Sequence, residues 1–299
     1  MADNQRHLVD LTRGVPKKFV STLGNAIELP TIPRVIQRAL EMMSDANVDL
    51  RLVANLLSHD AAVSAKLMRL SSLAAFGGYI FGKDNVEQVC RLLGFSRLRK
   101  LLIAMGIMTA SEPLLGEANY WGYWTAAATQ ANLAQHFAAE TNSVNTEEAF
   151  TVGLVRGVGR IVLAHRLNDE YKHIFKAARR DAQTFYHAGE RLGFNMDWIS
   201  ADILSAWGIK PTIVRVVEMW HQANIGSSLH RISLAANALA SINSNTRLPG
   251  DFDDAPTGSL RSALTELNLP VDRLDYYLQL RQYEYGNAIE LVGSSRQRE

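Results

Sequence analysis

The chain has 299 residues, of which 47% are hydrophobic and 20% are charged, so it can bury a large core and is too apolar to be disordered. Its 31 basic and 30 acidic residues leave a formal net charge of +1, which argues against broad, non-specific nucleic-acid binding. The single cysteine, Cys90, excludes a disulfide framework and a thiolate zinc site within one chain. The sequence shows neither a signal peptide nor an apolar segment typical of a membrane-spanning helix, so we expect a cytoplasmic protein.

Apolar residues recur at helical spacing through the first half of the chain. Asp49 is the expected N-cap of the second helix, Gly94 the left-handed stop of the fourth, and Ser96 the N-cap of the fifth. The expected helices carry the apolar residues from Val35 to Met43, Leu50 to Leu57, Val63 to Ala74, Val86 to Leu93 and Leu98 to Met105.

The second half has the same character. A long helix carries a stripe of small residues between Trp124 and Ala134, and the apolar segment 149–163 follows it. No segment shows the alternation of a strand, so the sequence predicts an all-α protein. Further helices are expected over 169–180, 183–192, 197–207, 212–222 and 229–243, then a loop over 244–259, and a helical pair over 259–268 and 270–290.

Short motifs stand in a fixed order along these helices. They are Leu29-Pro-Thr-Ile-Pro33, Leu57–Val63, Lys66–Gly77 and Val86–Arg99, followed by Tyr123-Trp124, Ala149–Leu154, Gly159–Leu163 and Gly193–Pro211. In this order the chain resembles the HDOD family, relatives of the HD-domain metal phosphohydrolases that occur in bacterial signalling proteins. The resemblance covers residues 22–225 and implies a multi-helix fold with two lobes. It divides the chain into an N-terminal helical extension (1–21), an N-terminal lobe (22–115), an HD-like lobe (116–225) and a C-terminal helical extension (226–299).

The resemblance also assigns the metal ligands of the catalytic HD relatives, which hold ions that activate water for phosphoester hydrolysis. These ligand positions fall on Ala126, Arg156-Gly157, Met196 and Trp220-His221. Of these residues, only His221 has a side chain that can bind a metal ion. Arg156 places a fixed positive charge where the central ligands would be. One imidazole cannot hold a catalytic ion, so we expect no metal, no cofactor and no catalytic residues.

Two other groups have ligand-type residues. The dipeptide His59-Asp60 lies outside the HD-like lobe, and Asp60 is the expected N-cap of the next helix. His165, Asp169 and His173 would share a helix face that could hold zinc. A helix break at Leu167–Asp169, with Asp169 or Asn168 as a cap, is the simpler interpretation.

The vacated metal pocket is the first candidate site. It comprises Arg156, Arg160, Asp202, Arg215, Glu218 and His221. Two interpretations stay open: an anion or nucleotide phosphate binds the arginines, or Arg156 and a carboxylate such as Glu218 or Asp202 form a structural ion pair that fills the space.

A cationic cluster is the second candidate site. Arg91, Arg97, Arg99 and Lys100 have no acid among them and could form a basic contact patch or simply a solvated helix face. Gly153, Gly157 and Gly159 do not fit a phosphate-binding loop and predict close helix packing. Core positions are expected for Cys90, Trp198, Trp207 and Trp220.

These observations predict a non-catalytic signal-transduction module that docks onto a signalling protein in trans, through the cleft between its lobes or its C-terminal helices. A nucleotide- or anion-binding sensor that uses the vacated pocket is the first alternative, and a metal-dependent phosphohydrolase with an unconventional site is the second. Nucleic acid is the least favoured partner. Tyr276, Tyr277, Leu278 and Leu280 could dock the last helix onto another chain, including a second copy.

Overall fold

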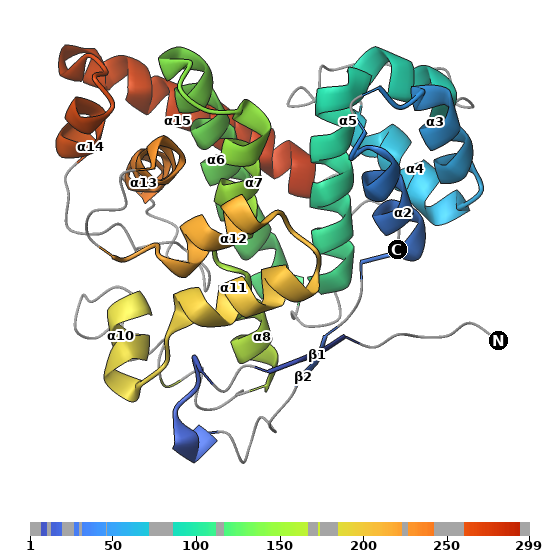
Figure 1. Cartoon of the computed structure of the whole chain (residues 1–299). Helices are drawn as coiled ribbons and strands as arrows, with labels where there is room; N and C mark the ends of the chain where they lie inside the picture. Colours follow the sequence, from blue (N-terminus) through green and yellow to red (C-terminus); the bar gives the residue numbers. More distant parts are fainter. Residues whose placement is uncertain are drawn as a thin grey trace.

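The computed structural model describes residues 7–10, 13–19, 27–29, 32–45, 47–71, 86–111, 117–166, 173, 185–222, 227–241 and 260–293. Within these ranges the chain is almost entirely helical, which confirms the all-α class (Figure 1). None of the described helices is long and apolar enough to cross a membrane.

The described part of the N-terminal lobe contains four helices, and their boundaries follow local signals. The Asp49 carboxylate accepts a hydrogen bond from the Arg51 N–H, and the Asp60 carboxylate accepts one from the Val63 N–H at 2.9 Å, so both residues cap helices as predicted. Gly94 has φ +68° and kinks the fourth helix where the sequence places a stop. The four helices are α2 (Arg34–Met42), α3 (Leu50–Ser58), α4 (Ala61–Ser71) and α5 (Val86–Ser111).

The HD-like lobe is built around α6 and α7, which pack along each other. Asn145 caps α7 by accepting hydrogen bonds from the Glu147 and Glu148 N–H groups, and Asn195 caps α11 in the same way through the Trp198 N–H. The helices are α6 (Glu117–Thr141), α7 (Thr146–Val155), α8 (Val158–Arg166), α10 (Phe185–Leu192), α11 (Met196–Ala206) and α12 (Pro211–Glu218).

Glycines permit the close helix contacts of this lobe. A Cβ atom on Gly153 would lie 2.7 Å from the Ala131 backbone on α6, and one on Gly159 would lie 2.7 Å from the Ser200 hydroxyl on α11. The Gly159 N–H donates to that hydroxyl at 3.1 Å. At these two positions the packing role predicted from the sequence is confirmed.

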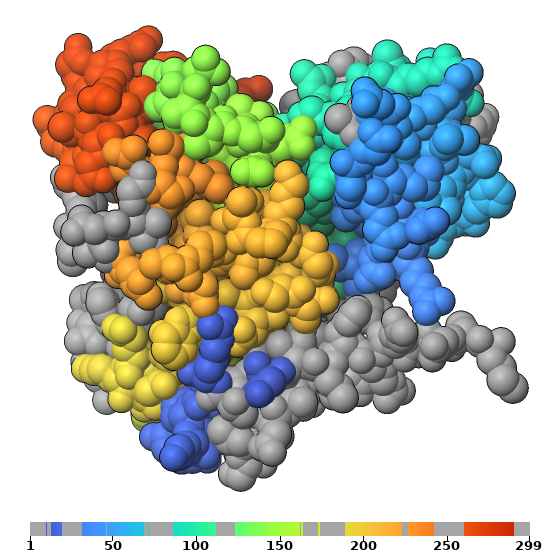
Figure 2. All heavy atoms as spheres, viewed as in Figure 1, coloured from blue at the N-terminus to red at the C-terminus, as the bar shows by residue number. Residues whose placement is uncertain are grey.

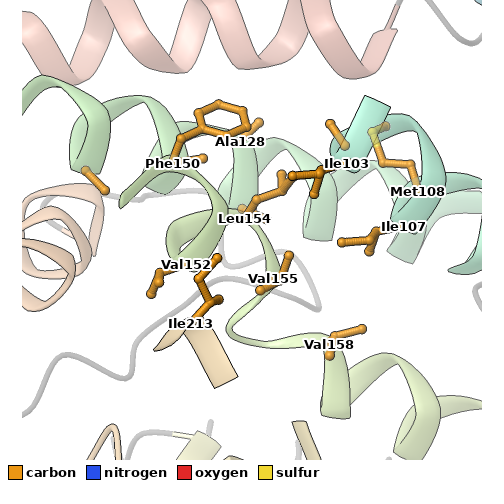
Figure 3. Packing of buried hydrophobic residues seen from close by; sticks show 14 of the residues in the cluster. Ile103, Ile107, Met108, Ala128, Phe150, Val152, Leu154, Val155, Val158 and Ile213 are labelled. Carbon is orange, nitrogen blue, oxygen red and sulfur yellow. The ribbon is translucent and has the colours of Figure 1, made fainter. Parts of the chain in front are cut away.

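The second half of α5 joins the two lobes. Ile103, Ile107 and Met108 are buried and belong to the same apolar cluster as Phe150 and Leu154 of α7 (Figure 3). This half of α5 is buried almost all round, so one continuous core runs from the N-terminal lobe into the HD-like lobe.

The C-terminal extension packs on the HD-like lobe. Tyr277 is fully buried, its ring lies 5.6 Å from that of Phe137 on α6, and its hydroxyl donates to Glu140 at 3.2 Å. Burial is the main cause that raises the pKa of Tyr277 to about 12. Tyr277 therefore contacts its own chain, contrary to the prediction that it docks onto another.

The elements of the C-terminal extension are α13 (Ser228–Ser241), α14 (Leu260–Glu266), the 3₁₀ turn η3 (Val271–Arg273) and α15 (Leu274–Gly293). The predicted loop 244–259 lies outside the described residues.

Among the described residues, a short antiparallel ribbon departs from the all-α prediction, and its first strand lies in the N-terminal segment that was expected to be helical. Strand β1 (His7–Val9) pairs with β2 (Ile27–Leu29), with His7 opposite Leu29, and β1 contacts α11. Strands of three residues are too short to show the alternation by which strands are recognised in a sequence. The ribbon places the N-terminal segment beside the HD-like lobe.

Candidate functional site

Arg156 is the centre of a buried polar cluster at the turn between α7 and α8. It is 5% exposed, and its guanidinium carbon lies 4.4 Å from the centre of the Trp220 ring. Its Nη2 atom donates to Asn237 Oδ1 on α13 at 2.9 Å, and the same oxygen accepts a hydrogen bond from Gln130 of α6. Burial lowers the pKa of Arg156 to about 10, although the Asp197 carboxylate opposes this change. The guanidinium is thus held by an amide oxygen and an aromatic face.

His221 and Asp197 form the polar pair next to this arginine. His221 Nδ1 lies 2.8 Å from Asp197 Oδ2, and the His221 backbone N–H donates to the same oxygen at 3.3 Å. Burial is the main cause that lowers the pKa of His221, and the Arg156 charge acts in the same direction. A neutral imidazole then donates from Nδ1 to the Asp197 carboxylate, which also faces the arginine.

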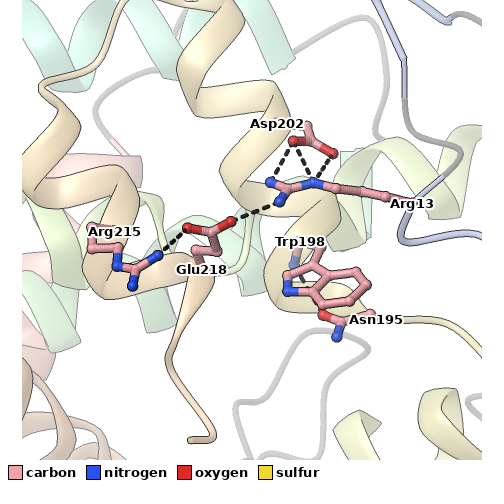
Figure 4. A network of polar contacts seen from close by, with 6 residues as sticks. All are labelled: Arg13, Asn195, Trp198, Asp202, Arg215 and Glu218. Atoms are coloured by element: carbon pink, nitrogen blue, oxygen red, sulfur yellow. Dashed lines mark hydrogen bonds and ion pairs between the residues drawn. The ribbon is translucent and has the colours of Figure 1, made fainter. Parts of the chain in front are cut away.

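The other predicted members of the vacated pocket lie apart from Arg156. Arg13, from the N-terminal segment, donates from Nε to both oxygens of Asp202 at 2.9 Å and from Nη1 to Glu218 at 2.6 Å (Figure 4). Arg215 donates to the second oxygen of Glu218 at 3.2 Å. The Arg13 hydrogen bond is the main cause that lowers the pKa of Glu218. Asp202, Arg215 and Glu218 therefore form an outer ion-pair network.

Arg160 is buried on α8, where it is 5% exposed. The structure thus places five of the six predicted pocket residues in two groups, a buried one of Arg156 and His221 and an outer one of Asp202, Arg215 and Glu218. Sequence reasoning missed Arg13, which lies 189 residues from Asp202, and also Asp197, Gln130 and Asn237. Asp197 directly follows Met196, an assigned ligand position, which was the one local signal for it.

The residues around Arg156 do not fit a metal ion. The positions that the resemblance assigns to ligands hold the half-buried Ala126 and the buried Arg156, Met196 and Trp220 beside His221. No three His, Cys, Asp or Glu residues in the described ranges lie close enough together to bind an ion. The Arg156 guanidinium would also repel a cation coordinated by His221 and Asp197.

The predicted cationic cluster does not form one surface. Arg91 is exposed and pairs with Glu87 on its own helix, whereas Arg99 donates to the Met43 carbonyl at 2.6 Å. Lys100 is 5% exposed, donates to Gln135 of α6 at 3.0 Å and lies over the Phe150 ring. Consecutive helix positions point about 100° apart, so Arg99 and Lys100 face different neighbours and Arg97 faces solvent. A single basic contact patch made by all four residues was therefore a wrong prediction.

The remaining candidate residues have structural positions. His59 is exposed on the helix end next to the cap Asp60. Burial raises the pKa of the Cys90 thiol to about 12, which is consistent with the predicted core position. Trp207 and Trp220 are buried as predicted, whereas Trp198 is half-buried below Arg13. His165 and Asp169 of the possible zinc trio are not among the residues whose side chains are described, and His173 is exposed.

A cleft of about 320 Å³ lies where the two lobes meet. Its walls are mainly apolar, with Ile32, Leu40 and Ile103 on one side and Trp207 and Ile213 on the other. Figure 2 shows the blue and teal N-terminal lobe meeting the green and gold HD-like lobe along this line. At the rim, Lys210 pairs with Glu148 at 3.1 Å. Arg99 lines the cleft, but none of the six vacated-pocket residues does.

Comparison with known proteins identifies the fold. The family model described as the HDOD domain matches residues 29–223, which is more than half of the chain. The chain belongs to the HDOD family. No curated protein is significantly similar to it in sequence.

Solved HDOD-like structures share the architecture at low sequence identity. An HDOD domain protein of unknown function from Geobacter sulfurreducens is 19% identical, with 96% of this chain and 97% of that chain covered and a TM-score of 0.74. A candidate phosphohydrolase from Shewanella amazonensis is 21% identical over 89% of this chain and 95% of that one, with a TM-score of 0.67. A candidate signal transduction protein from Marinobacter aquaeolei is 16% identical over 96% of this HDOD chain and 64% of that longer chain, with a TM-score of 0.71.

Proposed function

We propose that this HDOD protein is a non-catalytic signalling module that acts by docking onto a partner protein. The observation that carries the proposal is the buried Arg156 guanidinium, which stacks on Trp220 and binds Asn237 where the HD relatives place metal ligands. Without a donor set for an ion, the lobe has no means to activate water in the manner of those enzymes. Relatives described as signalling proteins and relatives described as phosphohydrolases share this fold, so the site residues have to decide between the two roles.

The interlobe cleft is the proposed docking surface. It lies at the surface, and apolar residues of both lobes line it together with charged residues such as Glu41, Glu147 and Glu148. Such a cleft can accept apolar side chains of a partner, while its charged rim orients them. The anion-sensor alternative receives less support, because Arg156 is 5% exposed and its guanidinium already has protein contacts.

The test of docking compares captured proteins among variants of the full-length chain. Lys210→Glu breaks the pair with Glu148 and places a third carboxylate beside Glu147 and Glu148 at the cleft rim. Arg261→Glu makes the same charge change at an exposed position on α14, away from the cleft. We expect the immobilised wild type and Arg261→Glu to retain the same signalling protein from a lysate of the native cell, and Lys210→Glu to lose it. Equal retention by all three chains would contradict docking through the cleft.

A further inference from the structure

The N-terminal strap, defined as residues 13–19, is a turn followed by a short helical stretch at residues 17–19, and it lies on the HD-like lobe. Figure 2 shows this blue segment on the surface of the yellow and gold helices. Its contacts fall on two neighbouring elements, α11 and α12, and on the turn that precedes α11. Arg13, Gly14, Pro16 and Phe19 make the contacts described below.

Arg13 provides the charged contact. Its guanidinium bridges Asp202 of α11 and Glu218 of α12 and lies over the Trp198 ring, 5.7 Å from the ring centre (Figure 4). Asp202 and Glu218 are 17% and 22% exposed in their side chains, whereas Arg13 is 43% exposed. Two carboxylates and an aromatic face thus form a preformed arginine site on the lobe.

Gly14 provides the steric contact. Its carbonyl accepts a hydrogen bond from the Asn195 N–H at 2.8 Å. A Cβ atom on Gly14 would lie 2.6 Å from Ile199 Cγ1 and 2.9 Å from the Asn195 carbonyl oxygen. The residue that follows the arginine therefore has to be glycine for the strap to lie this close to α11.

Phe19 provides the apolar contact. Its ring stacks on Phe194, with ring centres 4.8 Å apart and an angle of 29° between the planes. Between Gly14 and Phe19, Pro16 packs on Gly193, where a Cβ atom would lie 3.1 Å from Pro16 Cγ. The lobe therefore distinguishes an arginine, the glycine after it and an aromatic residue five positions further on.

We propose that this surface is a recognition site for arginine-glycine segments and that the strap occupies it as an internal competitor. The partner is a protein that presents an exposed segment with arginine, glycine and, five positions on, an aromatic residue. The proposal rests on the docking function and adds a second contact surface with its own specificity and regulation. The Arg13 ion pairs, the Phe19 ring stack and the buried Val15 hold the strap. These contacts are a small part of the whole core, so release of the strap costs less than unfolding the core. Because the strap is tethered, its effective concentration is high, and the site stays closed until a partner competes.

The test uses a fluorescein-labelled synthetic peptide with the sequence of residues 10–21, DLTRGVPKKFVS, and full-length protein. Arg13→Ala removes the ion pairs of the internal strap, and Gly14→Ala displaces the strap sterically while its arginine stays. We expect each variant to bind the peptide at least about tenfold more tightly than the wild type, because the competitor is weakened. Fluorescence anisotropy gives the affinities, and circular dichroism shows that each variant is folded.

Two controls test the specificity of this site. Adding Asp202→Asn and Glu218→Gln to the Arg13→Ala chain should abolish the gain, and a peptide with alanine in place of Arg13 or Gly14 should bind weakly to every chain. Equal peptide binding by the wild type and both folded strap variants would overturn the proposal. No cell partner enters this assay, so its failure is distinct from failure of the capture experiment.

Discussion

At the scale of single residues, Arg156 is the main departure from the chemistry of catalytic HD proteins. A positive charge that is 5% exposed is tolerated because Asn237, the Trp220 ring and the nearby Asp197 carboxylate compensate for lost hydration. The residue therefore places a buried cation at a position that the resemblance assigns to a metal ligand.

This assignment predicts a large stability effect at Arg156. Arg156→Ala should lower the free energy of unfolding by about 3–5 kcal/mol, because it leaves a cavity on Trp220 and removes the donor to Asn237. Arg156→Lys should recover only part of this loss, since an ammonium cannot reproduce the planar stacking. Urea denaturation measures both, with the exposed Arg261→Ala expected within about 0.5 kcal/mol of wild type. A similarly small effect for Arg156→Ala would show that the guanidinium does not support the lobe.

Lys100 predicts a pH dependence of stability. Burial lowers the pKa of Lys100 in the folded protein from its ordinary value of 10.5 to about 8. Between these two values the unfolded chain binds more protons than the folded one, so the contribution of Lys100 to stability rises with pH. From pH 7.5 to 9.5 the wild type should gain about 1–2 kcal/mol relative to Lys100→Met. Urea denaturation of both chains at the two pH values measures this gain. If the difference in free energy of unfolding between the two chains does not change with pH, Lys100 is well hydrated in the folded protein.

Sequence reasoning succeeded for residues whose role depends on near neighbours. Asp49 and Asp60 cap helices and Gly94 interrupts one, and each acts within a few residues of its own position. The residue type alone is therefore enough to predict these roles. It failed for Lys100, because the second half of α5 is buried almost all round and no charged residue there marks a solvent face. The Arg13 network could not be predicted, since its partners are 189 and 205 residues away.

At the scale of elements, glycines distinguish tight from loose helix contacts. Gly153 of α7 faces the α6 backbone with no room for a Cβ atom, whereas Gly286 of α15 is exposed and has nothing within 4 Å of such an atom. The same substitution at the two positions should therefore have opposite effects.

Gly153→Ala should destabilise the protein by about 1–3 kcal/mol, because a methyl group would force α6 and α7 apart. Gly286→Ala should instead stabilise it by about 0.5–1 kcal/mol through the higher helix propensity of alanine. Thermal unfolding measured by circular dichroism gives the sign of each change. An increase in melting temperature for Gly153→Ala would contradict the tight contact between α6 and α7.

At the scale of the whole molecule, the order of motifs predicted the fold and the two-lobe arrangement. That order reflects many buried helix contacts spread over about two hundred residues, which is why it could be recognised without any single strong motif. The candidate site was less predictable. Assigned ligand positions located Arg156 and His221, but packing between distant segments placed Asp202, Arg215 and Glu218 in a separate network with Arg13. The cleft and the strap surface likewise arise only when the lobes and the N-terminus meet.

Binding of Mn²⁺ to the purified full-length chain tests the proposal that Arg156 takes the place of the metal ion of the HD relatives. Equilibrium dialysis followed by elemental analysis gives the amount bound, with His221→Ala measured in parallel. We expect neither chain to retain stoichiometric Mn²⁺, since His221 and Asp197 lie beside a fixed cation. One equivalent of Mn²⁺ on the wild type that is lost in His221→Ala would contradict the account and restore a metal-dependent function.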